Sequence, residues 1–350
     1  MTRKLFFLFF IAIVANLNIA GIFAQNSRPK PKTKTAPPAR ITPTPTPVII
    51  LPTPTPVSLE TIVSEAEKQT ENYREEFKNL LGDEKKTFET FDKNGKSKKQ
   101  TVVESNFIAY QSPKDETQVT EYRNVVKVDG KSVGDSDKRA ADLFENLAKS
   151  ASAQQELENV QKESSRYDKT LELNGFTLNQ APVLAEHIRP FFDFQLDGQE
   201  MVDGKDVYVV SYRQKSKSPY VIFNDSQPKP DKFFLSFEAE LPKQVKEPNA
   251  LLRGKIWIDK QTYQIRREHR ELTIQPADTP NQLIINETEL EYQPSAVGIL
   301  TPKRIVFTDY NVKSKDKSAS ISAVLDTKAT FVYTKFTKSE VEVKSGDVKN

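Results

Sequence analysis

Few residues in this sequence have the type and spacing needed for chemistry. The 350 residues include two histidines and no cysteine, which rules out a thiol nucleophile, a disulfide and a cysteine metal site. His187 and His269 lie far apart, and neither has a second histidine at the spacing of metal ligands. Glu271 shares a predicted strand face with His269, but two ligands do not make a metal site. We therefore expect no bound metal and no cofactor.

Catalytic motifs of the common enzyme classes are also absent from the sequence. It has no G-x-S-x-G nucleophile elbow, no P-loop and no dinucleotide-binding fingerprint. Because 28% of the residues are charged, pairs of Asp and Glu occur throughout the chain and none stands out as an acid–base pair. We expect no catalytic residue and no enzymatic activity.

Residues 264–274 carry charged side chains on both faces of a predicted strand. One interpretation is an edge strand, in which charge prevents pairing with another chain. The other places Arg267 and His269 at the rim of a cavity, where they would meet an anionic head group. Trp257 is expected as a rim or core aromatic residue. The face that carries Arg267 is predicted to hold Ile265, Arg267, His269, Glu271 and Thr273.

Aromatic residues cluster in two other predicted strands, within 191–196 and 233–241. Plain core packing explains them, because aromatic side chains dominate protein cores. A lining for an acyl chain is the alternative, since a curved sheet that fails to close often leaves an apolar cavity. The candidates for such a lining are Phe191, Phe194, Phe233, Leu235 and Phe237.

The N-terminus has the pattern of an export signal. Basic residues precede an unbroken apolar run at 5–14, and Ala24 offers a small residue before a cut at Gln25. We expect a cleaved signal peptide in residues 1–24 and a periplasmic or envelope-associated protein. An uncleaved anchor is the alternative, which two asparagines in the segment disfavour because an amide in hydrocarbon needs a partner.

Residues 25–57 form a tether rich in Pro and Thr. They hold 10 of the 22 prolines, and their Thr-Pro repeats favour polyproline II. The segment is either a stiff spacer that carries the domain away from a surface or a leader without a role. The net charge of +3 comes from the N-terminal 57 residues, because residues 58–350 contain 44 basic and 48 acidic residues. A weakly acidic domain is a poor binder of nucleic acid, which we exclude as a partner.

A single β-rich domain is predicted over residues 58–350. Residues 58–81 have the apolar spacing of an amphipathic helix, with Ser58 as its N-cap and Gly82 as its stop. Turn and helix signals then predict hairpins at Asn94-Gly95, Asp129-Gly130 and Asp203-Gly204, a helical insertion at about 136–167, and a short helix from Pro182.

The rest of the chain is predicted to be one strand after another. Half-buried antiparallel strands in series form a large curved sheet or a half-open barrel, covered here by the N-terminal helix and the helical insertion. The fold class is therefore α+β and β-dominated. The predicted strands are 191–196, 207–212, 220–223, 233–241, 252–258, 264–274, 282–292, 303–310, 318–326 and 330–336.

These elements, in this order, resemble the lipoprotein-carrier-like fold of the LolA/LolB type. The resemblance lies in V-D-G-K at 128–131, V-D-G-K-D-V-Y at 202–208 and G-K-I-W-I-D at 254–259, followed by Tyr263 and Arg266-Arg267. These phrases are similar to ones in uncharacterised secreted bacterial proteins. The resemblance covers about residues 58–340, and it implies an unclosed barrel that is lidded by helices around an apolar cavity.

The sequence as a whole favours an exported, non-enzymatic domain that binds a hydrophobic or lipidic ligand, such as an acyl chain, in the cavity of a curved sheet. The alternative is an envelope protein–protein interaction or structural module with a filled core and no small-molecule ligand. A lipid or an envelope protein is accordingly the expected partner.

Overall fold

The computed structural model describes residues 57–78, 80–168, 177–223, 235–237, 241, 249–275, 282–315 and 320–338. The predicted signal peptide and all but Val57 of the predicted tether lie outside these residues, so the expectations for them stay predictions. Among the residues that the structure describes, no helix is long and apolar enough to cross a membrane.

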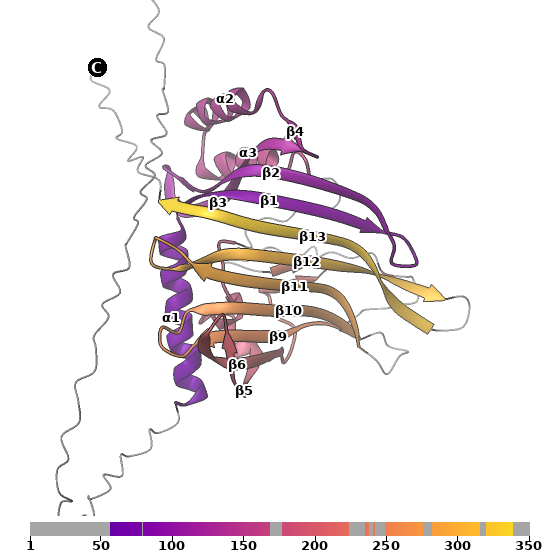
Figure 1. Ribbon diagram of the computed structural model, residues 1–350. Coiled ribbons are helices and arrows are strands. Elements are labelled where there is room, and N and C mark those ends of the chain that lie inside the picture. The colour runs from indigo at the N-terminus through magenta and orange to yellow at the C-terminus, as the bar shows by residue number, and fades with distance from the viewer. Residues whose placement is uncertain are drawn as a thin grey trace, which may run out of the picture. The chain divides into compact units, whose positions relative to one another are not determined.

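The N-terminal helix α1 runs from Leu59 to Phe77 (Figure 1). Ser58 caps it as predicted, because its side chain accepts a hydrogen bond from the Thr61 amide at 3.1 Å. The helix ends four residues earlier than expected, and Gly82 is not its stop. Gly82 lies in strand β1, Leu80–Phe91, where a Cβ would stand 3.0 Å from the ring of Phe336, so this glycine serves close packing.

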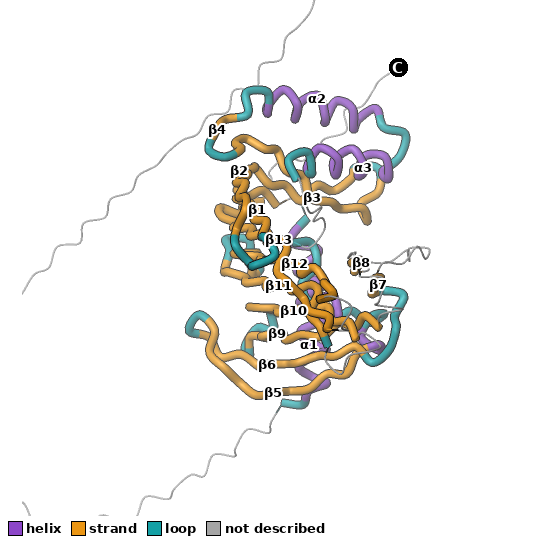
Figure 2. Tube along the Cα trace, turned by 90° about the vertical axis from the view of Figure 1, so that its right-hand side faces the viewer, coloured by secondary structure: helices purple, strands orange, loops and turns teal. Residues whose placement is uncertain are grey.

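Within the described residues, eleven strands form one antiparallel sheet in the order β4-β3-β2-β1-β13-β12-β11-β10-β9-β6-β5. The first long strand therefore pairs with the last, and the sheet does not close on itself (Figures 1 and 2). This open curved sheet is the predicted architecture. The remaining strands of the sheet are β2 Ser97–Ser112, β3 Asp115–Val128, β4 Lys131–Ser132, β5 Phe192–Val202, β6 Lys205–Gln214, β9 Asn249–Asp259, β10 Ile265–Gln275, β11 Leu283–Pro294, β12 Leu300–Lys315 and β13 Ser320–Lys338.

Two sequence-based predictions about the strands are wrong. From residue 320 on, the predicted strands 318–326 and 330–336 are parts of one continuous strand, β13. The charged strand β10 is not an edge strand, because it pairs with β9 on one side and with β11 on the other. Its charged side chains have cross-strand partners, such as Arg253 for Glu271 at 2.6 Å, and so they suit an interior position.

The helical insertion consists of α2, Ser136–Lys149, and α3, Ala153–Ser164, close to the predicted bounds. Buried Leu147 and Val160 pack against Tyr122 of β3. Helix α3 also lies along β3 (Figure 2), where the Ser164 Oγ accepts a hydrogen bond from the Arg123 amide at 3.1 Å. The insertion therefore occupies backbone groups on the outer side of β3 that would otherwise invite another strand.

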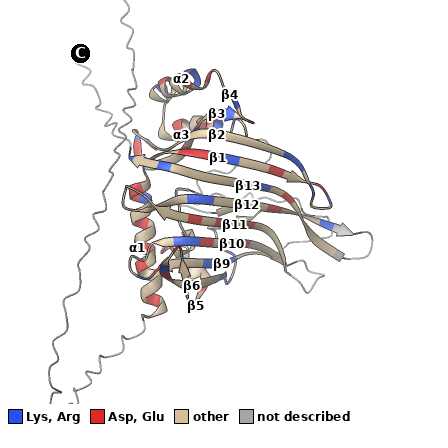
Figure 3. Ribbon diagram, in the orientation of Figure 1, with Lys and Arg blue, Asp and Glu red and all other residues tan. Residues whose placement is uncertain are grey.

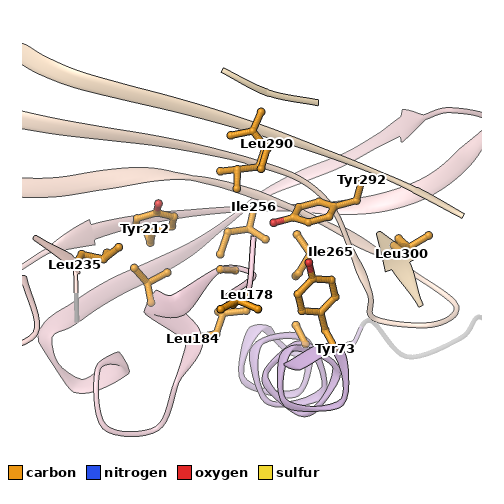
Figure 4. Close-up of a cluster of buried hydrophobic side chains, with 14 of the residues drawn as sticks. Tyr73, Leu178, Leu184, Tyr212, Leu235, Ile256, Ile265, Leu290, Tyr292 and Leu300 are labelled. Carbon is orange, nitrogen blue, oxygen red and sulfur yellow. The ribbon is translucent and has the colours of Figure 1, made fainter. Parts of the chain in front are cut away.

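The main core lies between one face of the sheet, called here the concave face, and α1 with residues 177–191. Those residues include two short 3-10 helices, η1 Pro182–Leu184 and η2 Arg189–Phe191. Tyr73 of α1 meets Tyr292 of β11 edge-on, with ring centroids 6.1 Å apart (Figure 4). A separate parallel pair, β7 Val221–Phe223 and β8 Leu235–Phe237, contributes Leu235 to the same core.

We expect Phe77→Asp to unfold the domain or to lower its free energy of unfolding by about 3 kcal/mol or more. Phe77 is fully buried and packs on the rings of Tyr73, Phe107 and Phe336, so the new carboxylate would have no partner. Chemical denaturation followed by circular dichroism measures the change. Asn72→Asp on the exposed face of the same helix is the matched control and should change stability by under about 0.5 kcal/mol. Equal effects of the two changes would show that α1 is peripheral to the fold.

Candidate ligand-binding face

The concave face is most deeply buried where it meets α1. Leu290, Tyr292 and Ile305 are each at most 2% exposed and belong to the main core. At the ends of β9, β11 and β13 away from α1 the apolar side chains are half-buried, whereas β10 stays buried as far as Ile274. On β12, Phe307 is half-buried although Ile305, two residues nearer to α1, is 1% exposed.

Half-buried apolar side chains mark the far half of this face. Leu283 lies at the start of β11, away from α1, because Tyr292 at the other end of that strand contacts Tyr73 of α1. In the same way, Ile321 lies near the start of β13, and Phe336 near its other end contacts Phe77 of α1. We call the four such residues of β9, β11, β12 and β13 the far apolar row. They all pack against the main core: Ala250, Leu283, Phe307 and Ile321.

The near half of the concave face is filled by residues of the chain itself. The segment 177–191 passes between α1 and the sheet and places five apolar side chains in the main core (Figure 4). The apolar residues of this segment are as deeply buried as the strand residues of the main core. They are Leu178, Ala181, Val183, Leu184 and Ile188.

Two buried carboxylates of the sheet hold this segment. Glu121 of β3 accepts hydrogen bonds from the amide of Thr177 at 2.8 Å and from its hydroxyl at 2.5 Å. Glu268 of β10 accepts one from the amide of Ala181 at 3.0 Å. From the other side, the Tyr73 hydroxyl of α1 donates to the Thr177 carbonyl at 2.5 Å. The segment is thus bonded both to the sheet and to α1. Further bonds join the Gln180 side chain to the Leu300 carbonyl of β12 and the Arg74 side chain of α1 to Asn179.

Each of these carboxylates has a buried arginine beside it. Arg123 donates to Glu121 at 2.7 Å and to Glu84 at 2.9 Å, while Arg270 donates to Glu268 at 2.8 Å. Burial acts to lower the pKa of Arg123, but Glu84 and Glu121 outweigh it and hold that pKa well above its usual value. The guanidinium therefore stays charged without contact to solvent.

A further ion pair lies close to Arg123 on the concave face. Lys86 and Asp168 are 2.6 Å apart and their side chains are 1% and 3% exposed. Burial lowers the pKa of Lys86 and raises that of Asp168. The ammonium also lies over the rings of Phe88 and Phe331, at 5.1 and 5.3 Å from their centroids. The concave face therefore carries buried charge along β1 and β3, as it does at Glu268 and Arg270 of β10.

The predicted cavity residues all lie near the main core wherever the structure describes them. Phe191, Phe194 and Phe237 are half-buried against it, and Leu235 is 9% exposed within it. Phe194 also meets Tyr212, with ring centroids 6.3 Å apart. Phe233 lies outside the described residues. The structure brings these side chains to the main core.

The predicted rim residues are not at a rim of the concave face, and this prediction is corrected. Trp257 joins Val207 and Val209 in a small cluster on the opposite, convex face. Arg267 stacks on the Trp257 ring at 4.8 Å, and the His269 Nε2 lies 2.9 Å from Glu287. The cause is a register shift between Ile265 and Arg267, which turns Glu268 and Arg270 inward in place of their neighbours.

One acidic side chain lies within the far half of the concave face. Asp309 of β12 accepts a hydrogen bond from the buried Asn286 amide at 2.7 Å. Burial raises the pKa of this carboxyl to about 6, with a smaller contribution of the same sign from Asp326. Asp309 therefore changes charge near neutral pH, two positions along β12 from Phe307.

Comparisons with solved structures give matches that span most of the domain. The chain is similar to a LolA superfamily protein from Nitrosomonas europaea at 8% identity, with 82% of this chain and 96% of that chain covered and a TM-score of 0.30. A lipoprotein-sorting protein domain from Vibrio parahaemolyticus matches at 10% identity, with 79% and 95% covered and a TM-score of 0.29. Mycobacterium tuberculosis lipoprotein LppX matches at 11% identity, with 82% and 100% covered and a TM-score of 0.24. No protein-family model and no curated protein matches the chain.

The architecture that the resemblance implied, an open antiparallel sheet with a helix across its concave face, is present in the structure. At such low TM-scores these matches say nothing about ligand or partner.

We expect Glu268→Gln to lower the free energy of unfolding by about 3 kcal/mol. The amide can still meet Ala181, but it leaves the Arg270 charge buried without its counter-ion. Urea denaturation measures the change, and Glu289→Gln on a partly exposed position of β11 is the control. A loss below about 1 kcal/mol would show that the buried pair does not hold segment 177–191 in place.

We expect Asp309→Asn to stabilise the domain above pH 7 by about 1–2 kcal/mol. A carboxyl whose folded pKa is about 6 favours folding below its unfolded pKa of about 3.8, and that contribution is lost as pH rises through 6. The gain from the asparagine should therefore shrink towards pH 4, where the aspartic acid is also neutral. Urea denaturation at pH 4, 6 and 8 tests this, with exposed Asp193→Asn as the control. A gain that does not depend on pH would contradict the raised pKa.

Proposed function

We propose that this chain is an exported, non-enzymatic domain that binds a hydrophobic or lipidic ligand, with an acyl chain along the far half of the concave face. The observation that carries the proposal is the far apolar row, Ala250, Leu283, Phe307 and Ile321, which continues the core but is only half-buried. Apolar side chains left accessible on a concave face are the usual lining of a site for an apolar ligand.

The size of the expected interaction follows from the surface that an acyl chain would bury. Each buried methylene group contributes roughly 0.8 kcal/mol, so eight of them supply about 6 kcal/mol. That free energy corresponds to a Kd of tens of micromolar, on the order that a reversible carrier needs. The three half-buried phenylalanines Phe191, Phe194 and Phe237 would then pack beside the core and not against the ligand.

The second candidate function is an envelope interaction or structural module without a small ligand. It is favoured by segment 177–191, which already fills the near half of the concave face with Leu178, Val183 and Leu184. Under that hypothesis the half-buried apolar row is covered by other parts of the chain or by a protein partner.

Export through a signal peptide in residues 1–24 is part of the proposal and is supported by the sequence alone. N-terminal sequencing of the exported protein distinguishes a mature start at Gln25 from an intact Met1 that would indicate a retained anchor.

We expect the full chain, purified without detergent, to carry lipid in native mass spectrometry and to bind a fluorescent fatty acid saturably. Phe307→Asp should weaken that binding at least tenfold, because it puts a charge at the boundary between the far apolar row and the main core. Val332→Asp is the matched control, since Val332 is 39% exposed on β13, outside the main core. A folded protein with no lipid and no saturable binding would exclude the carrier function and leave the interaction module.

A further inference from the structure

A cluster on the convex face of the sheet is not used by the proposed ligand site. We propose that His269, Glu271 and Glu287 bind a divalent transition-metal ion, with Zn²⁺ as the probe. Each residue offers one ligand atom, and the three atoms lie within 4.8 Å of one another. This site is independent of the proposed lipid binding, since it lies on the other side of β10 from Glu268 and the main core.

The strands bring these residues together by register. His269 and Glu271 are two positions apart on β10 and so point to the same face. Glu287 of β11 lies directly opposite Glu271, which adds a third ligand from the neighbouring strand. The sequence contains no spacing that would reveal this third residue, because 16 positions separate the paired glutamates.

The distances are close to those of a metal site. The His269 Nε2 lies 2.9 Å from the Glu287 Oε1 and 3.8 Å from the Glu271 Oε1. Nitrogen and oxygen ligands bind Zn²⁺ at about 2.0–2.2 Å, so two ligands of a tetrahedral site lie about 3.3–3.5 Å apart. Shifts of about half an ångström would bring the imidazole to this distance from each carboxylate. The two carboxylate oxygens, which lie within 4.8 Å of each other, would have to approach further, and a water molecule would complete the coordination.

The two carboxylates are already oriented by groups outside the cluster. The Arg253 Nε donates to the Glu271 Oε2 at 2.6 Å, and the Tyr310 hydroxyl donates to the Glu287 Oε2 at 3.1 Å. In both glutamates the outer oxygen is thus occupied while Oε1 faces the imidazole. Hydrogen bonds of this kind fix ligand orientation in metal sites and raise metal affinity.

The charge around the cluster does not prevent cation binding. The two glutamates carry two negative charges, and Glu271 shares its charge with Arg253 through Oε2. The other nearby cations are engaged elsewhere, Lys255 with Asp197 at 3.0 Å and Arg267 over the Trp257 ring. The three ligand side chains are 17–28% exposed, so an ion can enter from solvent. One imidazole and two carboxylates suit a borderline ion such as Zn²⁺ better than Ca²⁺ or Mg²⁺, which prefer oxygen ligands alone.

Isothermal titration of the full, untagged chain with Zn²⁺, after removal of metal by a chelator, tests the site. We expect one ion per chain with a Kd of about 1–10 µM. His269→Asn and Glu287→Gln should each weaken binding at least tenfold. Glu289→Gln, which makes the same change two positions along β11, and His187→Asn, which removes the other histidine, should leave the Kd within twofold.

Co²⁺ gives a second readout that a change in stability alone would not alter. We expect tetrahedral or five-coordinate Co²⁺ absorption bands in the visible range, lost in His269→Asn and shifted in Tyr310→Phe, with circular dichroism confirming the fold of each variant. The proposal is overturned if the chain binds no Zn²⁺ below 100 µM. It is equally overturned if His187→Asn, and not His269→Asn, abolishes binding.

Discussion

Two sheet carboxylates accept hydrogen bonds from segment 177–181, and these bonds set the arrangement of the whole core. Glu121 reaches the Thr177 amide and Glu268 reaches the Ala181 amide, so β3 and β10, which are far apart in the sheet, are both bonded to one short segment. That segment has little regular structure of its own, and its backbone groups would be costly to bury without such partners. Arg123 and Arg270 complete the arrangement, because each provides a buried carboxylate with a counter-ion.

This constraint divides the concave face into parts with different roles. The near half is a closed core in which α1 rests on segment 177–191 and on the sheet. The strip of charge along β1 and β3 cannot line an apolar ligand, since Lys86, Arg123 and Glu84 are buried there and paired. What remains for a ligand is the far half of β9 to β13, with Phe307 at the boundary. The Lys, Arg, Asp and Glu positions coloured along β10 to β13 in Figure 3 include residues of the convex face, where the cross-strand pairs of Arg253, Glu289 and Arg304 lie.

The sequence predicts the elements that depend on local signals. Ser58 caps α1, Asn94-Gly95 and Asp129-Gly130 turn the chain with φ of 76° at both glycines, and Ser152 caps α3. Features that depend on distant partners were not predictable in this way. Gly82 follows an apolar helical pattern, yet the Phe336 ring that explains it comes 254 positions later. Similarly, Glu84 and Arg123 have the residue types of surface charges, and only the folded sheet shows that their side chains meet on its inner face. The sequence of segment 177–191 also contains no signal that two glutamates of the sheet bind it.

In strand β10, a register shift at one residue, Arg266, decides which side chains face the core and which face the convex side. With Ile265 in the core, plain alternation would turn Arg267 and His269 inward, as the sequence suggested. The register shift at Arg266 reverses this, and Arg266 itself is held by Asp259 at 2.7 Å at the end of β9. As a result Glu268 and Arg270 face segment 177–191, while His269 and Glu271 face Glu287 on the convex side. The buried anchor of the core and the proposed metal ligands are thus fixed by the same irregularity. A substitution that removes the Arg266–Asp259 contact would have to disturb both, since the two sets of side chains alternate along a single backbone.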